Sequence, residues 1–105
     1  MNEMQYILVK LAEEASEVAK IALKTAQFGL DSACTTESET NRQLLHKELN
    51  DLFAAVSALN AHHGLGFHPS EEAIFKKTEK MKHYMGVSAS LGLVTLTPQK
   101  EEPHV

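Results

Sequence analysis

The sequence contains only one cysteine and no long apolar run, and both scarcities exclude whole classes of protein. Cys34 alone cannot form an internal disulfide or a cysteine-based zinc site. No apolar run approaches the roughly 20 residues that a membrane-spanning helix needs. The first residues lack the basic, apolar and small-residue order of a signal peptide, because Glu3 lies where a basic region would be. We therefore expect a cytoplasmic protein with no membrane partner.

Positive charge is also scarce. The 105 residues include 10 Lys and Arg against 14 Asp and Glu, which gives a formal net charge of −4. Non-specific binding to DNA or RNA depends on an excess of Lys and Arg, so no nucleic-acid partner is expected. An acidic protein that binds an anionic nucleotide needs added positive charge, and a divalent cation is the usual source.

Helical periodicity, in contrast, is strong. In the first 30 residues, apolar side chains recur at the i, i+3, i+4 and i+7 spacing of an amphipathic helix, which Gly29 would end. These side chains are Met4, Ile7, Leu8, Leu11, Ala15, Val18 and Ala22. The length suits a single domain, and the pattern indicates an all-α fold.

A second helix is predicted after a polar connector. Thr36 and Glu39 have the spacing of a capping box, so this helix is expected to start near Glu37. Its end is expected at Gly64 or Gly66. Its apolar stripe consists of Leu45, Leu49, Leu52, Val56 and Leu59.

A third helix is predicted to follow Ser70, a suitable N-cap, and to end at Gly86. We therefore expect a domain over residues 1–86 and a C-terminal extension over residues 87–105. The extension begins with small and β-branched residues that suit a short strand or an ordered segment. Its polar, proline-containing end is expected to fray.

Four acidic residues lie at the edges of the first two apolar stripes. Helical geometry places Glu14 and Glu17 on the shoulder of the first helix, and Glu48 and Asp51 in the same place on the second. An antiparallel pairing would bring both pairs together, where the carboxylates repel one another unless a cation lies between them. Hard cations such as Mg²⁺ prefer oxygen ligands and keep positions open for phosphate. Alternatively, the acids are ordinary solvated residues, which are common at this spacing.

The same residues carry a resemblance to a known family. The segments Glu13-Glu14-Ala15-Ser16-Glu17 and Glu48-Leu49-Asn50-Asp51 resemble the EExxE…ExxD signature of the all-α NTP pyrophosphohydrolases, the MazG-like superfamily. The resemblance implies hydrolysis of nucleoside triphosphates to monophosphate and pyrophosphate. It implies Mg²⁺ as the cofactor, with Mn²⁺ as a substitute. The implied metal ligands are Glu14, Glu17, Glu48 and Asp51, of which the three glutamates are also assigned catalytic roles.

The resemblance implies substrate-binding residues as well. Lys77 and Tyr84 are similar to a lysine and a following tyrosine in relatives, where the lysine contacts the triphosphate. Lys80 and Lys24 are further phosphate candidates, because lysine is a point charge without directional demands. The sequence departs from the family at Met81, where relatives often have Asn, and lacks the tryptophan that stacks on the base in some members. Base recognition is therefore left open.

A homo-oligomer is expected, because three helices of this size bury only a thin core. The simplest form is a homodimer that completes a four-helix bundle, and the resemblance makes a homotetramer plausible. Two alternatives to the nucleotide hydrolase stay open. One is a non-enzymatic helical dimerisation or regulatory module, and the other is the same fold acting on phosphoribosyl-ATP.

Overall fold

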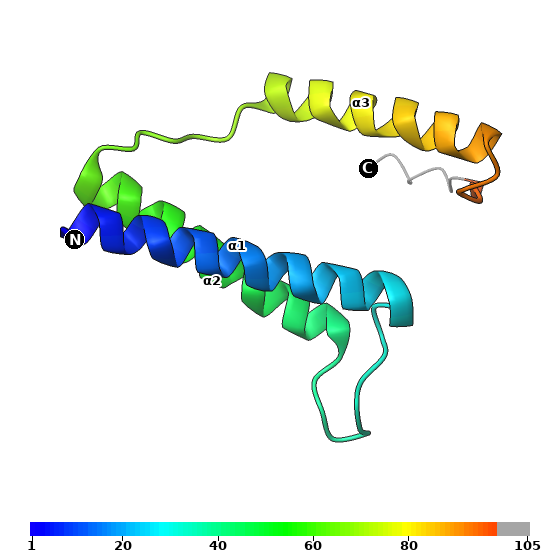
Figure 1. Cartoon of the computed structure of the whole chain (residues 1–105), viewed down its shortest axis with the longest axis horizontal. Coiled ribbons are helices and arrows are strands. Elements are labelled where there is room, and N and C mark those ends of the chain that lie inside the picture. Colours follow the sequence, from blue (N-terminus) through cyan, green and yellow to red (C-terminus); the bar gives the residue numbers. More distant parts are fainter. Residues whose placement is uncertain (99–105) are drawn as a thin grey trace, which may run out of the picture. The chain divides into compact units, whose positions relative to one another are not determined.

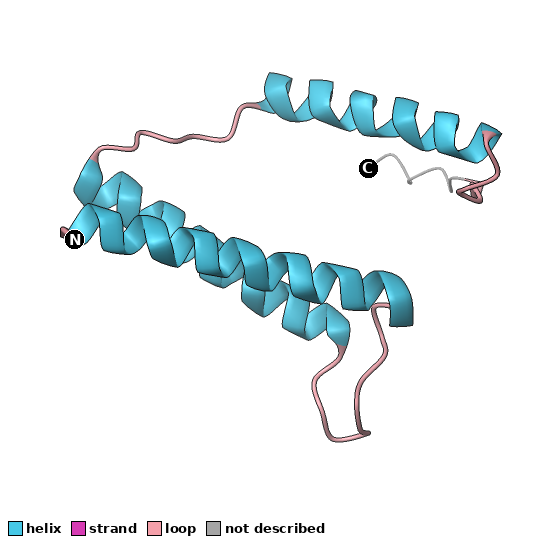
Figure 2. Cartoon of the chain, in the orientation of Figure 1, coloured by secondary structure: helices cyan, strands magenta, loops and turns pink. Residues whose placement is uncertain are grey.

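The computed structural model describes residues 1–98 and shows three helices in that range (Figure 1). They are α1 (Glu3–Phe28), α2 (Asn41–His63) and α3 (Glu71–Ser90). Loops connect them, and no strand occurs among the described residues (Figure 2). The predicted all-α class is confirmed. Of the two forms expected after Gly86, a short strand or an ordered segment, the strand is absent from the described residues, and the first four residues of the segment belong to α3. Residues 99–105, which include most of the end expected to fray, lie outside the described part.

The chain divides into two compact units, Met1–Phe67 and a second unit that starts at His68. The first unit is a helical hairpin in which α1 and α2 pack against each other. The second unit contains α3. No helix of the described chain combines the length and apolar character needed to cross a bilayer.

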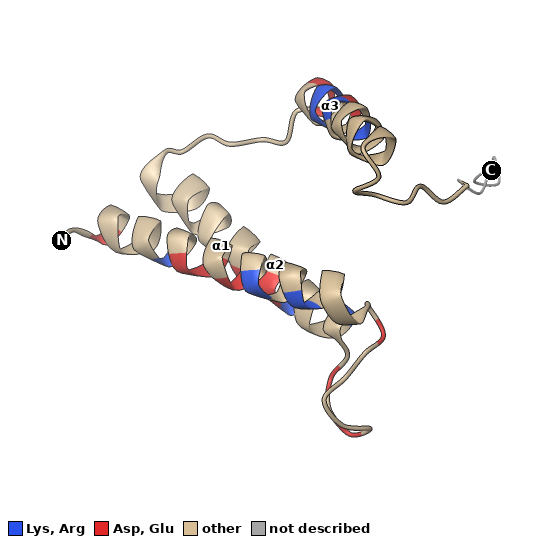
Figure 3. Cartoon of the chain, turned by 45° about the vertical axis from the view of Figure 1, so that its right-hand side comes forward, with Lys and Arg blue, Asp and Glu red and all other residues tan. Residues whose placement is uncertain are grey.

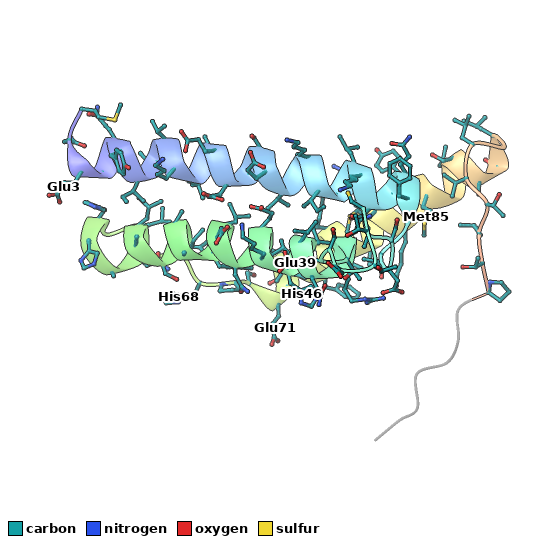
Figure 4. All side chains as sticks on the ribbon, turned by 90° about the horizontal axis from the view of Figure 1, so that it is seen from below. Glu3, Glu39, His46, His68, Glu71 and Met85 are labelled. Carbon is teal, nitrogen blue, oxygen red and sulfur yellow. The ribbon has the colours of Figure 1, made fainter. Side chains whose placement is uncertain are left out.

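α1 and α2 contact each other along a seam, a row of side chains on each helix that recurs on average every 3.5 residues, as in a coiled coil. Every one of its positions is buried or half-buried in the hairpin, and the least exposed apolar side chains are Leu59, Ile21 and Ala55, at 2%, 7% and 8%. Side chains from both helices occupy the space between them (Figure 4). On α1 the seam consists of Ile7, Leu11, Glu14, Val18, Ile21 and Thr25; on α2 it consists of Asn41, Leu45, Glu48, Leu52, Ala55 and Leu59. Two glutamates therefore occupy positions that are usually apolar.

The start of the second helix was predicted four residues too early. A capping box forms between Thr40 and Gln43: the backbone N–H of Gln43 donates to the Thr40 hydroxyl at 3.2 Å, and the backbone N–H of Thr40 donates to the Gln43 side chain at 2.8 Å. The competing pair, Thr36 and Glu39, lies in the loop. The Thr40 start prevails because it places Asn41 at the head of the seam.

The predicted stop at Gly86 is also wrong, because α3 continues to Ser90. Gly86 does not adopt a positive φ, whereas Gly92 has φ 77°. The backbone N–H of Gly92 donates to Ala89 at 3.0 Å and that of Leu93 donates to Ser88 at 2.9 Å, which is the bonding of a Schellman motif. The predicted ends at Gly29 and Gly64 and the predicted cap at Ser70 are confirmed.

A buried asparagine closes the hairpin at its loop end. Asn41 is 1% exposed, and its side-chain amide donates to the Gly29 carbonyl at 2.9 Å. Its backbone N–H donates to the Ser32 carbonyl at 2.9 Å. The end of α1 and the start of α2 are thus held together by hydrogen bonds from a residue that is itself almost fully buried.

Asn41→Ala should lower the free energy of unfolding by about 1–3 kcal/mol, because the Gly29 carbonyl loses a buried partner. Asn50→Ala is the matched control, since Asn50 is an exposed asparagine on the same helix. Denaturant unfolding followed by circular dichroism measures both values. Equal, small effects of the two substitutions would contradict the role assigned to Asn41.

Low pH should destabilise the loop between α1 and α2. The Arg42 guanidinium donates to Asp31 at 3.1 and 3.3 Å, and this bond and charge lower the pKa of Asp31 below its usual value of 3.8. Because the pKa of Asp31 is lower in the folded state than in the unfolded state, its ionised carboxylate stabilises the fold fully at any pH above the unfolded-state pKa. This stabilisation is lost as the pH falls through the folded-state pKa. Asp31→Asn should therefore flatten the fall in melting temperature below about pH 4, as measured by thermal unfolding across pH. The prediction is contradicted if Asp31→Asn leaves the fall in melting temperature below about pH 4 unchanged.

Candidate metal centre

Three carboxylates meet on one flank of the hairpin. Glu14 of α1 and Glu48 and Asp51 of α2 each offer an oxygen, and the three oxygens lie within 4.8 Å of one another. Glu14 and Glu48 are brought there by their seam positions, and Asp51 joins them because it lies three residues after Glu48 on the same helix. All three residues are half-buried, and the Glu48 side chain is only 16% exposed. Three of the four acids predicted from the sequence therefore converge.

The arrangement suits a hard divalent cation. All three donors are carboxylate oxygens, which Mg²⁺, Mn²⁺ and Ca²⁺ prefer over nitrogen or sulfur. Oxygens on opposite sides of one Mg²⁺ lie about 4 Å apart, so small side-chain movements would let all three bind the same ion. Three protein ligands leave further positions of an octahedral ion for water or phosphate. The donor set therefore fits Mg²⁺ better than zinc.

Glu17 lies beside this cluster and outside it. Its side chain is exposed, and it lines a cavity of about 150 Å³ that it shares with Glu48. The other lining residues are Lys20, Ile21, Lys24 and Leu44. The predicted role of Glu17 as a fourth metal ligand stays a prediction, and its place at the cavity makes it available to a water molecule or a substrate.

Two lysines at the site, Lys20 and Lys47, were not singled out from the sequence. Lys20 lines the cavity one turn beyond Glu17, and Lys24 follows it on the same flank. Lys47 lies 3.5 Å from Glu48 and 3.6 Å from Asp51. The signal for both was present in the sequence as i, i+3 and i, i+4 spacings to acids, but such pairs also occur throughout exposed helices.

Lys47 partly compensates the charge of the cluster. The carboxylates of Glu48 and Asp51 raise the pKa of Lys47 above its ordinary value of 10.5, mainly through their negative charge. The lysine side chain is 60% exposed, and its two ion pairs are long, so each is weak. Lys47 forms its two ion pairs with Glu48 and Asp51, whereas a cation between the three oxygens would compensate the charge of Glu14 as well.

The remaining predicted substrate residues lie on α3, in the second unit. Lys77, Lys80 and Tyr84 are all exposed, and the Tyr84 ring packs edge-on against His83 with 5.3 Å between ring centroids. Their predicted contact with a triphosphate therefore stays a prediction. Lys24, in contrast, lies on the hairpin and lines the same cavity as Glu17 and Glu48.

Comparison with known proteins adds no assignment: no protein-family model, curated protein or solved structure matches this chain.

Mg²⁺ should raise the melting temperature of the protein, because an ion that binds only the folded state stabilises it by mass action. At ten times the dissociation constant the gain is about 1.4 kcal/mol, or about 5–10 °C for a domain of this size. Thermal unfolding with and without Mg²⁺ measures the shift.

Glu48→Gln should abolish that shift, because it removes a charged ligand from the cluster. Glu13→Gln is the matched control: Glu13 is a neighbouring acid that is 55% exposed and pairs with Lys10 at 3.0 Å. It should keep the full Mg²⁺ effect. A shift that survives Glu48→Gln would place the ion elsewhere.

Proposed function

We propose that the protein is a Mg²⁺-dependent hydrolase of nucleoside triphosphates that releases a nucleoside monophosphate and pyrophosphate. The observation that carries this proposal is the meeting of Glu14, Glu48 and Asp51 beside a cavity that contains Lys20 and Lys24. A cation site of acids and a pair of lysines on the same flank offer both kinds of positive charge that a triphosphate needs.

The side of the hairpin that carries these acids and lysines also has room for the base of a nucleotide. A second cavity, of about 250 Å³, lies at the other end of the hairpin, with Tyr6 and His62 among its lining residues. Tyr6 lies eight residues from Glu14, or about 12 Å along the helix axis, a length that an extended nucleoside triphosphate spans. Phosphates near the acids and lysines would therefore leave the base close to aromatic side chains on which it can stack.

Different residues of the chain take different roles in the proposed reaction. When bound, Mg²⁺ neutralises charge on the phosphates and makes phosphorus easier to attack. Glu17 is exposed at the edge of the cavity, where its carboxylate can orient a water molecule and accept a proton from it. Lys20 and Lys24 bind phosphate oxygens and stabilise the pyrophosphate that departs. Cleavage between the α and β phosphates rests on the resemblance to the MazG-like family.

Two observations favour a different function. Lys47 already places a positive charge next to two of the three acids, and several large apolar side chains of the hairpin are exposed. Both features are typical of a helical association module whose acids serve only solubility. On that reading, Mg²⁺ leaves the melting temperature unchanged and no triphosphate is hydrolysed.

Pyrophosphate release from a panel of NTPs, dNTPs, modified nucleotides and phosphoribosyl-ATP, with Mg²⁺ present, tests the proposal. Glu48→Gln should lower kcat/KM by about 100-fold or more, because an electrostatic stabiliser of the transition state is lost. Lys20→Met should raise KM and also lower kcat, because Lys20 binds phosphate in the ground state and stabilises the departing pyrophosphate.

Ser16→Ala is the control for this assay, because Ser16 lies on the exposed side of α1 that faces away from α2. It should keep wild-type kinetics. Release of pyrophosphate only from phosphoribosyl-ATP would move the protein to that substrate class. No release from any member of the panel would contradict the hydrolase.

A further inference from the structure

The side of α1 that carries Glu17 and Lys20 also carries an aromatic side chain near each end of the helix. Tyr6 and Phe28 are 22 residues apart, which is a whole number of helical turns to within about 40°, so both lie on this side. Apart from Glu3, all charged residues of α1 lie between them (Figure 3). They are Lys10, Glu13, Glu14, Glu17, Lys20 and Lys24. Aromatic side chains therefore flank the charged middle of the helix.

A third cavity lies at the Phe28 end. Its volume is about 200 Å³, and Lys24 lines both this cavity and the cavity of about 150 Å³ beside the acids. The Lys24 ammonium lies 3.8 Å from the Cys34 sulfur, which places it at the border of the two cavities. The lining residues of the third cavity are Lys24, Phe28, Ser32, Ala33, Cys34 and Asn41. A group bound there would adjoin phosphates held beside Glu17.

The chemistry of the third cavity suits a nucleoside. Phe28 is exposed and offers a ring on which a base can stack. Asn41 is 1% exposed and its amide donates to the Gly29 carbonyl. In the described part of the chain its side-chain oxygen accepts no hydrogen bond, so it can accept one from a base N–H or a sugar hydroxyl. An aromatic wall with a few fixed polar groups is the usual form of a small-molecule site.

One mononucleotide cannot fill the cavities at both ends. Phosphates bound at Glu14 leave the base near Tyr6, about 12 Å away along the helix axis. Phe28 lies 14 residues from Glu14 in the opposite direction, or about 21 Å along the axis. A nucleoside triphosphate that reaches one end therefore stops short of the other. Two nucleosides joined by a longer phosphate chain can reach both.

We infer that the site takes dinucleoside polyphosphates, with one nucleoside against Tyr6 and the other against Phe28. The inference rests on the proposed function, because the same acids and lysines bind the phosphate chain. Lys20 and Lys24 lie along the middle of that chain, where its negative charge is highest. The nearby charges of Lys10 and Glu13 compensate each other at 3.0 Å.

The reaction on such a substrate follows the same course as on a triphosphate. The oxygen of one water bonds to the phosphorus next to one nucleoside, and the bond from that phosphorus to the bridging oxygen breaks. The bridging oxygen leaves with the rest of the chain, and Glu17 accepts a proton from the water. A dinucleoside tetraphosphate therefore consumes one water and gives a nucleoside monophosphate and a nucleoside triphosphate.

Calorimetric titration of the full chain, with Mg²⁺ present, tests the inference. The ligands are ATP and diadenosine tetraphosphate in which methylene groups replace the α,β bridging oxygens, so that neither is hydrolysed. The tetraphosphate analogue should bind the wild type about 10-fold more tightly, because a second base stacks. Phe28→Ala should remove most of this gain. Leu23→Ala is the matched control and should keep it, because Leu23 is a 73% exposed apolar residue on the side of α1 away from these cavities.

Product analysis with the hydrolysable nucleotides separates this inference from the proposed function. Diadenosine tetraphosphate should give AMP and ATP. If ATP is hydrolysed but the two analogues bind equally, or the gain survives Phe28→Ala, the dinucleoside inference is overturned and the hydrolase stands. A gain that depends on Phe28 without turnover of either nucleotide would support the two-nucleoside site and overturn the hydrolase. Binding of neither analogue would overturn both.

Circular dichroism shows whether Phe28→Ala keeps its helices. If it does not fold, Phe28→Leu gives the same test, because leucine keeps an apolar side chain at the end of α1 and removes the ring. An undiminished gain in the Phe28→Leu variant would overturn the inference.

Discussion

The seam between α1 and α2 brings negative charge into a half-buried contact, and the candidate site depends on this constraint. A repeat of 3.5 residues normally places apolar side chains at every seam position, but here it places Glu14 and Glu48 there. The helices cannot separate at this point without losing the burial of Ile21 and Ala55 on either side. Packing therefore holds the carboxylates together against their repulsion, which is the condition under which a cation binds.

The helices of the hairpin were predictable because their signals are local. Apolar periodicity, Gly29 and Gly64 defined most of α1 and α2, and the acid spacing anticipated that Glu14, Glu48 and Asp51 would meet. The start of α2 was missed because two capping boxes compete, and only the buried bond from Asn41 to Gly29 decides between them. Residues 29 and 41 are distant in the sequence, so no local pattern reveals that bond.

Other features were beyond the reach of a single sequence for physical reasons. A helix tolerates Gly86 at a small cost in free energy, so glycine alone does not define an end, and the Schellman bonds at Gly92 do. Lys20 and Lys47 look like any surface lysine until the hairpin places them beside the acids. The contribution of Lys77 and Tyr84 depends on where α3 lies when substrate is bound, which helical periodicity does not encode.

Crystals grown with Mn²⁺, which replaces Mg²⁺ and scatters anomalously, would test the central claim most directly. The account predicts an anomalous peak within coordination distance of carboxylate oxygens from Glu14, Glu48 and Asp51 together. If those three side chains instead bind only water and Lys47 in fully Mn²⁺-saturated crystals, the cluster is not a metal centre, and the hydrolase built on it is wrong.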